Sequence, residues 1–339
     1  MINIVLLTLL VVVAFAIIGM KDLFAVVMLA SIYGLLSASF FVAMDAVDVA
    51  FTEAAVGAGI STLLMLVVIS MTGRRENKTR HKPYSALLIV VITGSLLLYG
   101  TLDMPYFGSV AAPIHNHVAP RYINDSMQEI GIPNIVTSVL ASYRAFDTFG
   151  EVVVIFTAGI GVLALLSVVR RPEDSDKTAS ANDSMHEQHL VVRIVTKMLL
   201  PFILLFALYV QFHGDYGPGG GFQAGVIFAA AIILYAMLFG LSTARKVINQ
   251  AFIQLIAATG VLLYGCVGIA SILNGGNFFD YNVLSNEPVA GQHLGIILIE
   301  WGVGCTVASV MIIIFFNFAG RREKQHNNDH AHPKNQEPI

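Results

Sequence analysis

Long apolar runs separated by short polar segments dominate the chain. Nine of these runs are long enough to cross about 30 Å of hydrocarbon as helices. They cover Ile2–Ile18, Leu23–Ala43, Val49–Met71, Ser85–Leu102, Phe149–Val169, Ile194–Phe212, Phe222–Leu241, Phe252–Leu273 and Leu294–Phe318. The pattern predicts an all-α, polytopic integral membrane protein with about nine transmembrane helices.

The basic residues are distributed unevenly between the two sides of such a nine-span arrangement. Of the 19 Lys and Arg residues, all but Arg121 and Arg144 fall on one side. Because basic residues concentrate in cytoplasmic loops, the arrangement predicts an outside N-terminus and a cytoplasmic C-terminus. An eight- or ten-span arrangement would scatter the same residues over both sides.

Composition agrees with a membrane protein and narrows the classes of ligand. Hydrophobic residues make up 56% of the chain and charged residues 12%, about half the charged fraction of soluble domains. The net charge of −3 indicates no nucleic-acid partner. Cys266 and Cys305 lie inside apolar runs, and their spacing matches no metal motif. We expect no metal and no cofactor.

Three polar or mixed segments interrupt the apolar pattern. Residues 172–189 are typical of a cytoplasmic linker, and residues 321–339 of a disordered cytoplasmic tail. Between the fourth and fifth runs, Ile135–Phe146 has apolar residues at helical spacing after Pro133-Asn134. This spacing predicts a short helix at the outer interface.

The first candidate for chemistry is Glu53, which begins an otherwise apolar segment. A carboxylate inside a span is unfavourable by about 2.5–3.5 kcal/mol and normally faces protein or water. Gly57 and Gly59 follow one turn later and indicate either close helix packing or a weakened helical ladder. Two interpretations of Glu53 stay open, a functional acid and a carboxylate favoured by the helix N-terminus.

Two further acids lie in predicted spans. Glu151 stands near the start of its run, so it is either functional or a first-turn residue favoured by the helix dipole. Glu300 lies about two turns inside the last run, where helix capping does not explain it. It belongs either to an ion path or to a structural hydrogen-bond network.

A glycine-rich hairpin connects the sixth and seventh runs on the predicted outer side. Four glycines after Asp215, together with a proline, allow positive φ angles and close backbone approach. The segment is either a rigid helix connection or an ion or water entrance lined by free amides and by polar side chains. Its candidate residues are His213, Asp215, Pro218, Gly219, Gly220, Gly221 and Gln223.

In the nine-span arrangement Glu53, Glu151 and Glu300 all lie in the outer half of the membrane. Titratable groups placed in this way are typical of proton relays and cation paths. Lys197 is the single basic residue within a span, and it lies near the cytoplasmic end. The set therefore indicates part of a path rather than a whole pump.

Three blocks of the sequence, taken together, resemble parts of the multisubunit Mrp (Mnh) cation/proton antiporters, relatives of the membrane arm of respiratory complex I. Residues 1–75, with Thr52-Glu53-Ala54-Ala55 leading to Gly57-Ala58-Gly59, resemble the three-helix MbhD-like segment of the large antiporter protein MrpA. Residues 84–171, with Gly131-Ile132-Pro133-Asn134 and Gly150-Glu151, resemble the two-helix MbhE-like segment. Residues 190–320, with Pro218-Gly219-Gly220-Gly221-Phe222-Gln223, resemble the four-helix MnhB (MrpB) protein.

This resemblance implies a subunit of a Na⁺ (or K⁺ or Li⁺)/H⁺ antiporter in the bacterial plasma membrane, a transporter rather than an enzyme. It implies ion-translocating roles for Glu53 and Glu151, whereas Glu300 is added from its depth in the span. The expected partners are a separate, large antiporter-like protein and other small Mrp-type membrane subunits. Two alternatives stay open, a membrane subunit of a redox-driven complex and a scaffold subunit that moves no ions.

Overall fold

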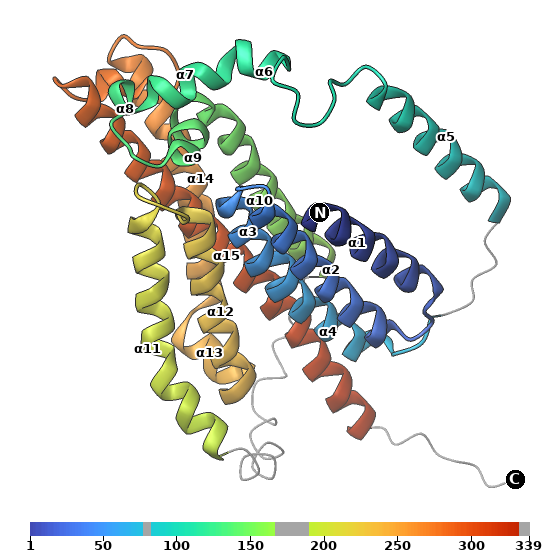
Figure 1. The fold of residues 1–339 in the computed structure, drawn as a ribbon. Helices are drawn as coiled ribbons and strands as arrows, with labels where there is room; N and C mark the ends of the chain where they lie inside the picture. The colour runs from blue at the N-terminus through green and yellow to red at the C-terminus, as the bar shows by residue number, and fades with distance from the viewer. Residues whose placement is uncertain (77–82, 167–189, 332–339) are drawn as a thin grey trace, which may run out of the picture.

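The computed structural model describes residues 1–76, 83–166 and 190–331. In these ranges nine helices are long and apolar enough to span a membrane, as the sequence predicted (Figure 1). The third span changes from α-helix to π-helix and back to α-helix. The spans are α1 (Ile2–Gly19), α2 (Leu23–Ala43), α3–η1–α4 (Val47–Glu53, Ala54–Ile60, Ser61–Thr72), α5 (Pro83–Thr101), α10 (Ala145–Leu166), α11 (Leu190–His213), α12 (Gly221–Phe239), α14 (Gln250–Leu273) and α15 (Pro288–Ala331).

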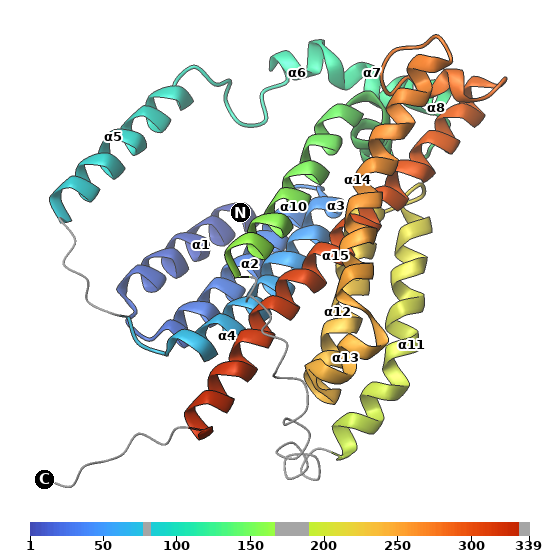
Figure 2. The same cartoon turned by 180° about the vertical axis from the view of Figure 1, so that it is seen from behind.

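Short elements cover the two ends of the bundle (Figure 2). One end, called the loop end here, carries the 214–220 loop and the elements between α5 and α10. The opposite end carries α13 and is called the α13 end. The short elements are α6 (Pro113–Asn116), α7 (Val118–Asn124), α8 (Ser126–Glu129), α9 (Ile135–Ser138), the π-helix η2 (Val139–Tyr143), α13 (Leu241–Val247) and the 3-10 helix η4 (Tyr281–Leu284).

The helix expected over Ile135–Phe146 forms as α9 and η2, but it packs into the bundle. Thr137, Ser138 and Ala141 are buried. The Thr137 hydroxyl donates to the Gly214 carbonyl at 2.6 Å, and this bond fixes the helix against the 214–220 loop. The small polar residues of this helix therefore find partners inside the protein, and its position at the outer membrane interface stays a prediction.

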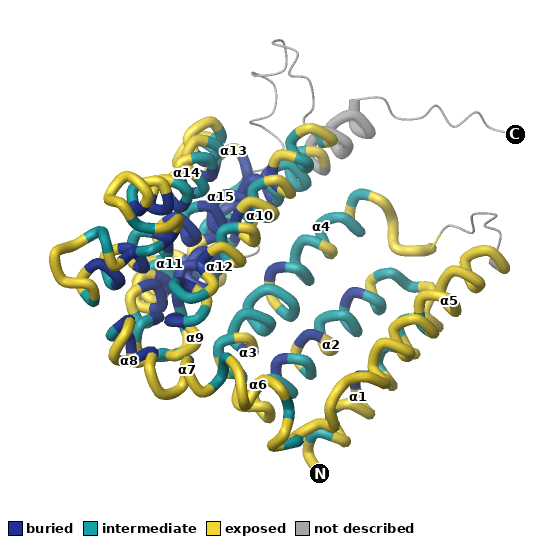
Figure 3. Tube along the Cα trace, turned by 90° about the horizontal axis from the view of Figure 1, so that it is seen from above, coloured by how far each residue is buried: buried dark blue, intermediate teal, exposed yellow. Residues whose placement is uncertain are grey.

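Helix α15 lies at the centre of the bundle, with α10, α12 and α14 packed around it (Figures 1 and 3). Glycines bring two of these helices close to α15. A Cβ at Gly221 would collide with the Glu300 carbonyl, and one at Gly225 would lie 2.8 Å from the Gly304 carbonyl. On the other side, a Cβ at Gly302 would lie 2.7 Å from the Gly260 carbonyl. Such near-backbone contact is how membrane helices pack tightly without a hydrophobic driving force.

Two spans are exposed along most of their length. No described residue of α5 is buried, and Leu10 is the single buried residue of α1. Figure 3 shows both helices apart from the buried core, and α5 stands away from the other spans in Figure 1. Apart from the side of α1 that packs against α2, the apolar faces of these helices therefore meet lipid or another protein.

Of the two polar segments predicted from the sequence, one lies outside the described residues and the other is described in part. The linker at residues 172–189 lies outside the described residues. Helix α15 continues to Ala331, so the beginning of the segment expected to be a disordered tail is helical. Adding residues such as Arg321 and Glu323 to an existing helix needs no new nucleation, which explains the difference.

Candidate functional site

Glu300 lies at the crossing of α12 and α15, beside the glycine loop. Its carboxylate is placed so that a Cβ on Gly220 would be 3.1 Å from Oε1, and one on Gly214 would be 3.2 Å away. Gly220 is the residue before α12, whose first amides have no acceptor within the helix and form its positive end. No described residue donates a hydrogen bond to the Glu300 carboxylate, and the side chain is half-buried.

A buried tyrosine lies within electrostatic reach of both Glu300 and Glu151. Tyr264 of α14 is 0% exposed, and its hydroxyl donates to the Ala145 carbonyl at 2.9 Å. The charges of both Glu151 and Glu300 lie within electrostatic reach of this phenol. In the described structure neither carboxylate bonds to Tyr264, so the acids on α10 and α15 share only the electrostatic influence on this phenol.

Glu151 itself is exposed on the surface of α10. Two residues of the preceding turn form an ion pair, with Arg144 Nη2 2.5 Å from Asp147 Oδ2. The sequence left a first-turn role open, but α10 begins at Ala145, so Glu151 lies in its second turn and Asp147 is the acid of the first turn. An acid on the exposed face of a span needs water or another protein beside it.

Glu53 lies where α3 passes into the π-helix η1. Its carboxylate occupies the place that a side chain at Gly57 would need, and Oε1 is 3.2 Å from a Cβ position on Gly34 of α2. The two glycines in η1 do not break the helix but accompany a π-helical segment, a form common at functional sites. Gly59 has only the Ala54 carbonyl near its Cβ position, at 3.5 Å.

A hydrogen bond links the Glu53 helix to the start of α12. Gln223 donates from Nε2 to the Thr52 hydroxyl at 2.9 Å, and Gln223 is buried. In the described structure no hydrogen bond or ion pair joins Glu53 directly to Glu151 or Glu300. The Thr52–Gln223 bond therefore ties α3 to the start of α12 without bonding to either carboxylate.

The 214–220 loop is held by two other segments of the chain. From α3, Asp48 accepts a hydrogen bond from the Gly219 amide at 3.1 Å. From the start of α9, Asn134 donates to the carbonyls of Gly214 and Gly217, each at 3.0 Å. The loop is thus the point where the three parts of the sequence meet.

Several loop amides that the sequence suggested were free are already bonded. The Gly217 amide donates to the His213 carbonyl, and the Gly220 amide to the Val210 carbonyl. The amides of Gly217 and Gly220 are therefore not free, and the role of the loop as an ion or water entrance stays a prediction. His213 stacks on Tyr209 with ring centroids 4.9 Å apart, and Pro218 is exposed in the loop.

Asp215 is the loop residue with a distinct electrostatic setting. Its Oδ2 lies 4.0 Å from Nδ1 of His293 on α15, and the side chain is 18% exposed. Burial raises the pKa of the Asp215 carboxyl above its ordinary value, and His293 opposes that shift. Asp215 also lies within electrostatic reach of Glu300. It places a titratable pair between Glu300 and the loop end.

Sequence reasoning did not find His293, Tyr264 or Thr52. Each lies in or beside an apolar run, and nothing in the run distinguishes it from a packing residue. The contacts of these three residues depend on which neighbouring helix packs against them, and the sequence pattern does not contain that information. Asp48 stands at the start of α3, and its bond to the Gly219 amide depends on the fold.

Comparison with protein families divides the chain into three parts. Residues 8–74 match the MbhD family, the D component of MBH, and residues 85–183 match the MbhE family, its E component. Residues 191–313 match the domain related to the MnhB subunit of Na⁺/H⁺ antiporters. These matches bear out the resemblance seen in the three sequence blocks.

Two curated relatives show how the chain compares in length. It is 31% identical over 141 residues to the antiporter subunit mnhB2 of Staphylococcus aureus (strain Newman), covering 41% of this chain and 99% of that one. It is 24% identical over 314 residues to the A/B component of a K⁺/H⁺ antiporter of Rhizobium meliloti (strain 1021), covering 84% of this chain. The match spans 31% of that longer relative.

Two solved structures share the fold. A chain of the Mrp complex from Dietzia sp. DQ12-45-1b matches 93% of this chain with a TM-score of 0.74 and 23% identity, and the match covers 34% of that chain. A chain of the membrane-bound sulfane sulfur reductase, an archaeal respiratory membrane complex, matches 70% of this chain with a TM-score of 0.51 and 27% identity. The match covers 98% of that second chain.

The fold thus occurs both in an Mrp complex and in an archaeal respiratory membrane complex. The relative of Staphylococcus aureus is matched over almost its whole length at 31% identity. The chain therefore belongs to the MnhB family of Mrp-type antiporter subunits, and it also carries MbhD and MbhE domains.

Proposed function

We propose that this chain carries part of the route by which H⁺ and a monovalent cation, Na⁺ or else K⁺ or Li⁺, exchange across a bacterial plasma membrane. The observation that carries the proposal is the position of Tyr264, a buried phenol within electrostatic reach of both Glu151 and Glu300. Acids connected through polar groups inside a membrane domain support proton relay or cation coordination. The loop end faces outward in this proposal, in line with the distribution of basic residues.

Glu300 is the central group of the proposed route. Its carboxylate has no hydrogen-bond donor among the described residues, so it is available to a proton or a cation. The positive end of α12 favours its charged form, whereas the half-buried setting favours the neutral form. Opposing influences of this kind suit a group that must change its charge during transport.

Partner subunits complete the transporter in this proposal. The match to the Rhizobium meliloti relative covers 31% of its length, and that to the Dietzia chain 34%. The exposed faces of α1, α5 and Glu151 support contact with a separate, large antiporter-like protein and with other small Mrp-type subunits. Glu151 then faces the interface between this chain and a partner.

The first test is the Glu300→Gln variant in everted vesicles that contain the whole complex. Gln keeps the size of the side chain but cannot exchange a proton. We expect cation-dependent proton exchange to fall by about tenfold or more, on the scale of a lost acid–base group. Glu287→Gln is the matched control, because Glu287 is exposed just before α15.

The amount of assembled complex must be equal in both variants, which mass spectrometry of the purified complex measures. Wild-type exchange in both Glu300→Gln and Glu53→Gln would show that the chain is a scaffold that moves no ions. Loss of exchange in Glu287→Gln as well would show that the effect is not specific to the acid at the helix crossing.

A redox-driven complex is the second candidate function. It is favoured by the match to the sulfane sulfur reductase chain, which this chain covers almost completely. Purification of the tagged chain from native membranes in mild detergent separates the two candidates. We expect antiporter-like subunits without redox proteins. Iron–sulfur subunits in the same preparation would instead assign the acids to coupling with electron transfer.

A further inference from the structure

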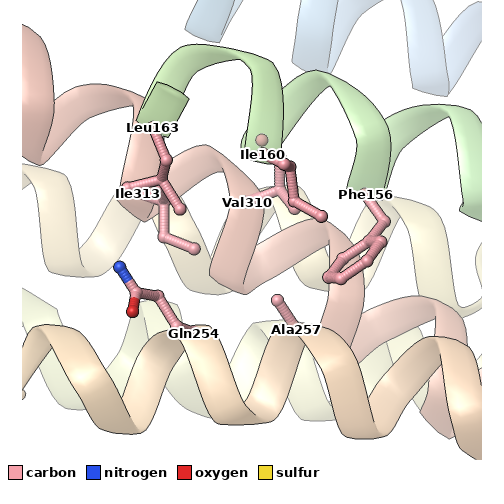
Figure 4. A pocket seen from close by; sticks show the side chains of 8 residues that line it. Phe156, Ile160, Leu163, Gln254, Ala257, Val310 and Ile313 are labelled. Atoms are coloured by element: carbon pink, nitrogen blue, oxygen red, sulfur yellow. The ribbon is translucent and has the colours of Figure 1, made fainter. Parts of the chain in front are cut away.

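A cavity of about 140 Å³ lies between α10, α14 and α15, on the α13 side of Tyr264. Figure 4 shows side chains from all three helices directed into it. Ile160, one of its lining residues, is 48% exposed, so the wall of the cavity reaches the surface of the chain. The lining residues are Phe156, Gly159, Ile160, Leu163, Gln254, Ala257, Val310 and Ile313.

Gln254 is the single polar side chain in this lining. Its carboxamide points from α14 into the space beside Leu163 and Ile313 (Figure 4). It has no hydrogen-bond partner within the described ranges. An amide without a partner in an apolar site is unfavourable by about 1–3 kcal/mol, and a water molecule removes that penalty.

The cavity continues the face of α14 that carries Tyr264. Gln254, Ala257, Val261 and Tyr264 are three or four residues apart and therefore lie along one side of the helix. Thr306 of α15 lies beside the same face, with its hydroxyl 2.9 Å from the Gly302 carbonyl and 3.4 Å from the Ala257 carbonyl. Polar atoms thus extend from the Tyr264 phenol toward the cavity.

An aromatic ring separates the two regions. Phe156 of α10 covers the end of the cavity at Ala257, opposite the end that Gln254 occupies (Figure 4). Ala257 precedes Tyr264 by two turns of α14, so the ring lies on the way from the cavity to the phenol. Hydrophobic constrictions of this kind block water in channels until they move.

We propose that this cavity is the aqueous access from the α13 end to the acids at Tyr264, with Gln254 holding water at its mouth and Phe156 closing its inner end. The inference rests on the proposed route through Glu300 and adds the half of the path that the glutamates do not supply. The ligand is water together with the proton that it conducts. Opening requires the Phe156 ring to leave the space beside Ala257.

Thiol accessibility tests the water in the cavity independently of transport. In a background with Cys266→Ser and Cys305→Ser, single Ala257→Cys and Leu163→Cys variants of the full complex are treated with a charged, membrane-impermeant methanethiosulfonate reagent. The reagent reacts with thiolate, which forms only in contact with water. Leu255→Cys on the same helix is the control, because Leu255 is 58% exposed on a face that does not line this cavity.

We expect both cavity thiols to react about tenfold faster than the Leu255→Cys thiol, and from the α13 side of the membrane only. Gln254→Leu should slow the reaction at Leu163→Cys without reducing complex yield. Equal, slow reaction at all three positions would overturn the proposal, as would faster reaction from the loop end.

A leak measurement tests the constriction. Phe156→Ala should raise passive proton conductance of the vesicles severalfold in the absence of exchanging cation, whereas Phe202→Ala, on the exposed side of α11, should not. An unchanged leak in assembled Phe156→Ala complex would refute the constriction. Reactive cavity thiols together with normal exchange in Glu300→Gln would refute the proposed route and leave the water access intact. Unreactive cavity thiols together with reduced exchange in Glu300→Gln would refute the water access and leave the route intact.

Discussion

At the residue scale, the positions of the half-buried carboxylates of Glu53 and Glu300 depend on glycines that leave room for them. Glu300 lies over Gly214 and Gly220, and Glu53 lies over Gly57 and Gly34. Gly220 also adopts a φ of 121°, which residues with a side chain rarely reach. The glycine-rich hairpin noted in the sequence therefore makes space for an acid rather than offering amides to an ion.

Asp215 gives a prediction of pH dependence at this scale. Its pKa is raised from the usual 3.8 because burial disfavours the charged carboxylate. The folded protein then binds the proton more tightly than the unfolded chain. The free energy of unfolding therefore falls as pH rises from the usual carboxyl pKa through the raised one. We expect Asp215→Asn to remove that loss, so that its stability advantage over wild type is greater at about pH 7 than at about pH 4.

Thermal unfolding of the purified complex across that pH range measures the effect. Asp280→Asn is a suitable control, because Asp280 lies at the same end of the bundle in the turn before η4. A stability difference between Asp215→Asn and wild type that grows as pH falls would contradict the sign derived from burial.

At the element scale, the π-helix η1 connects the acid of α3 to the rest of the bundle. Gly57→Ala would place a methyl group against the Glu53 carboxylate, whereas Gly59→Ala meets only one carbonyl at 3.5 Å. We expect Gly57→Ala to lower the exchange rate severalfold by displacing Glu53, and Gly59→Ala to leave it near wild type. Equal exchange rates in the two assembled variants would show that the position of Glu53 over Gly57 is irrelevant to transport.

The spans themselves could be predicted because each is a separate apolar run bounded by polar residues. Predicted and observed limits of α2 coincide at Leu23 and Ala43. The site could be predicted only in part. The three acids Glu53, Glu151 and Glu300 stand out in the sequence because they lie in apolar runs. Whether each faces the protein interior or the surface of the chain depends on helix packing, as the exposure of Glu151 shows.

At the scale of the whole molecule, the 214–220 loop joins domains that are separate families elsewhere. Asp48 bonds it to the MbhD domain, and Asn134 bonds it to the MbhE domain. The acids of these domains are thereby held at the loop end of one bundle. In contrast, α1 and α5 bury little surface within the chain, which agrees with a subunit that works inside a larger complex.

The central claim is that Tyr264 connects Glu151 and Glu300 in one route, and the most direct test is the exchange rate of the Tyr264→Phe variant. Tyr281→Phe is the control, because Tyr281 is also buried and its hydroxyl has no hydrogen-bond partner in the described structure. The account predicts that Tyr264→Phe assembles normally and loses about tenfold or more in exchange, while Tyr281→Phe keeps the wild-type rate. Wild-type exchange in assembled Tyr264→Phe would contradict it.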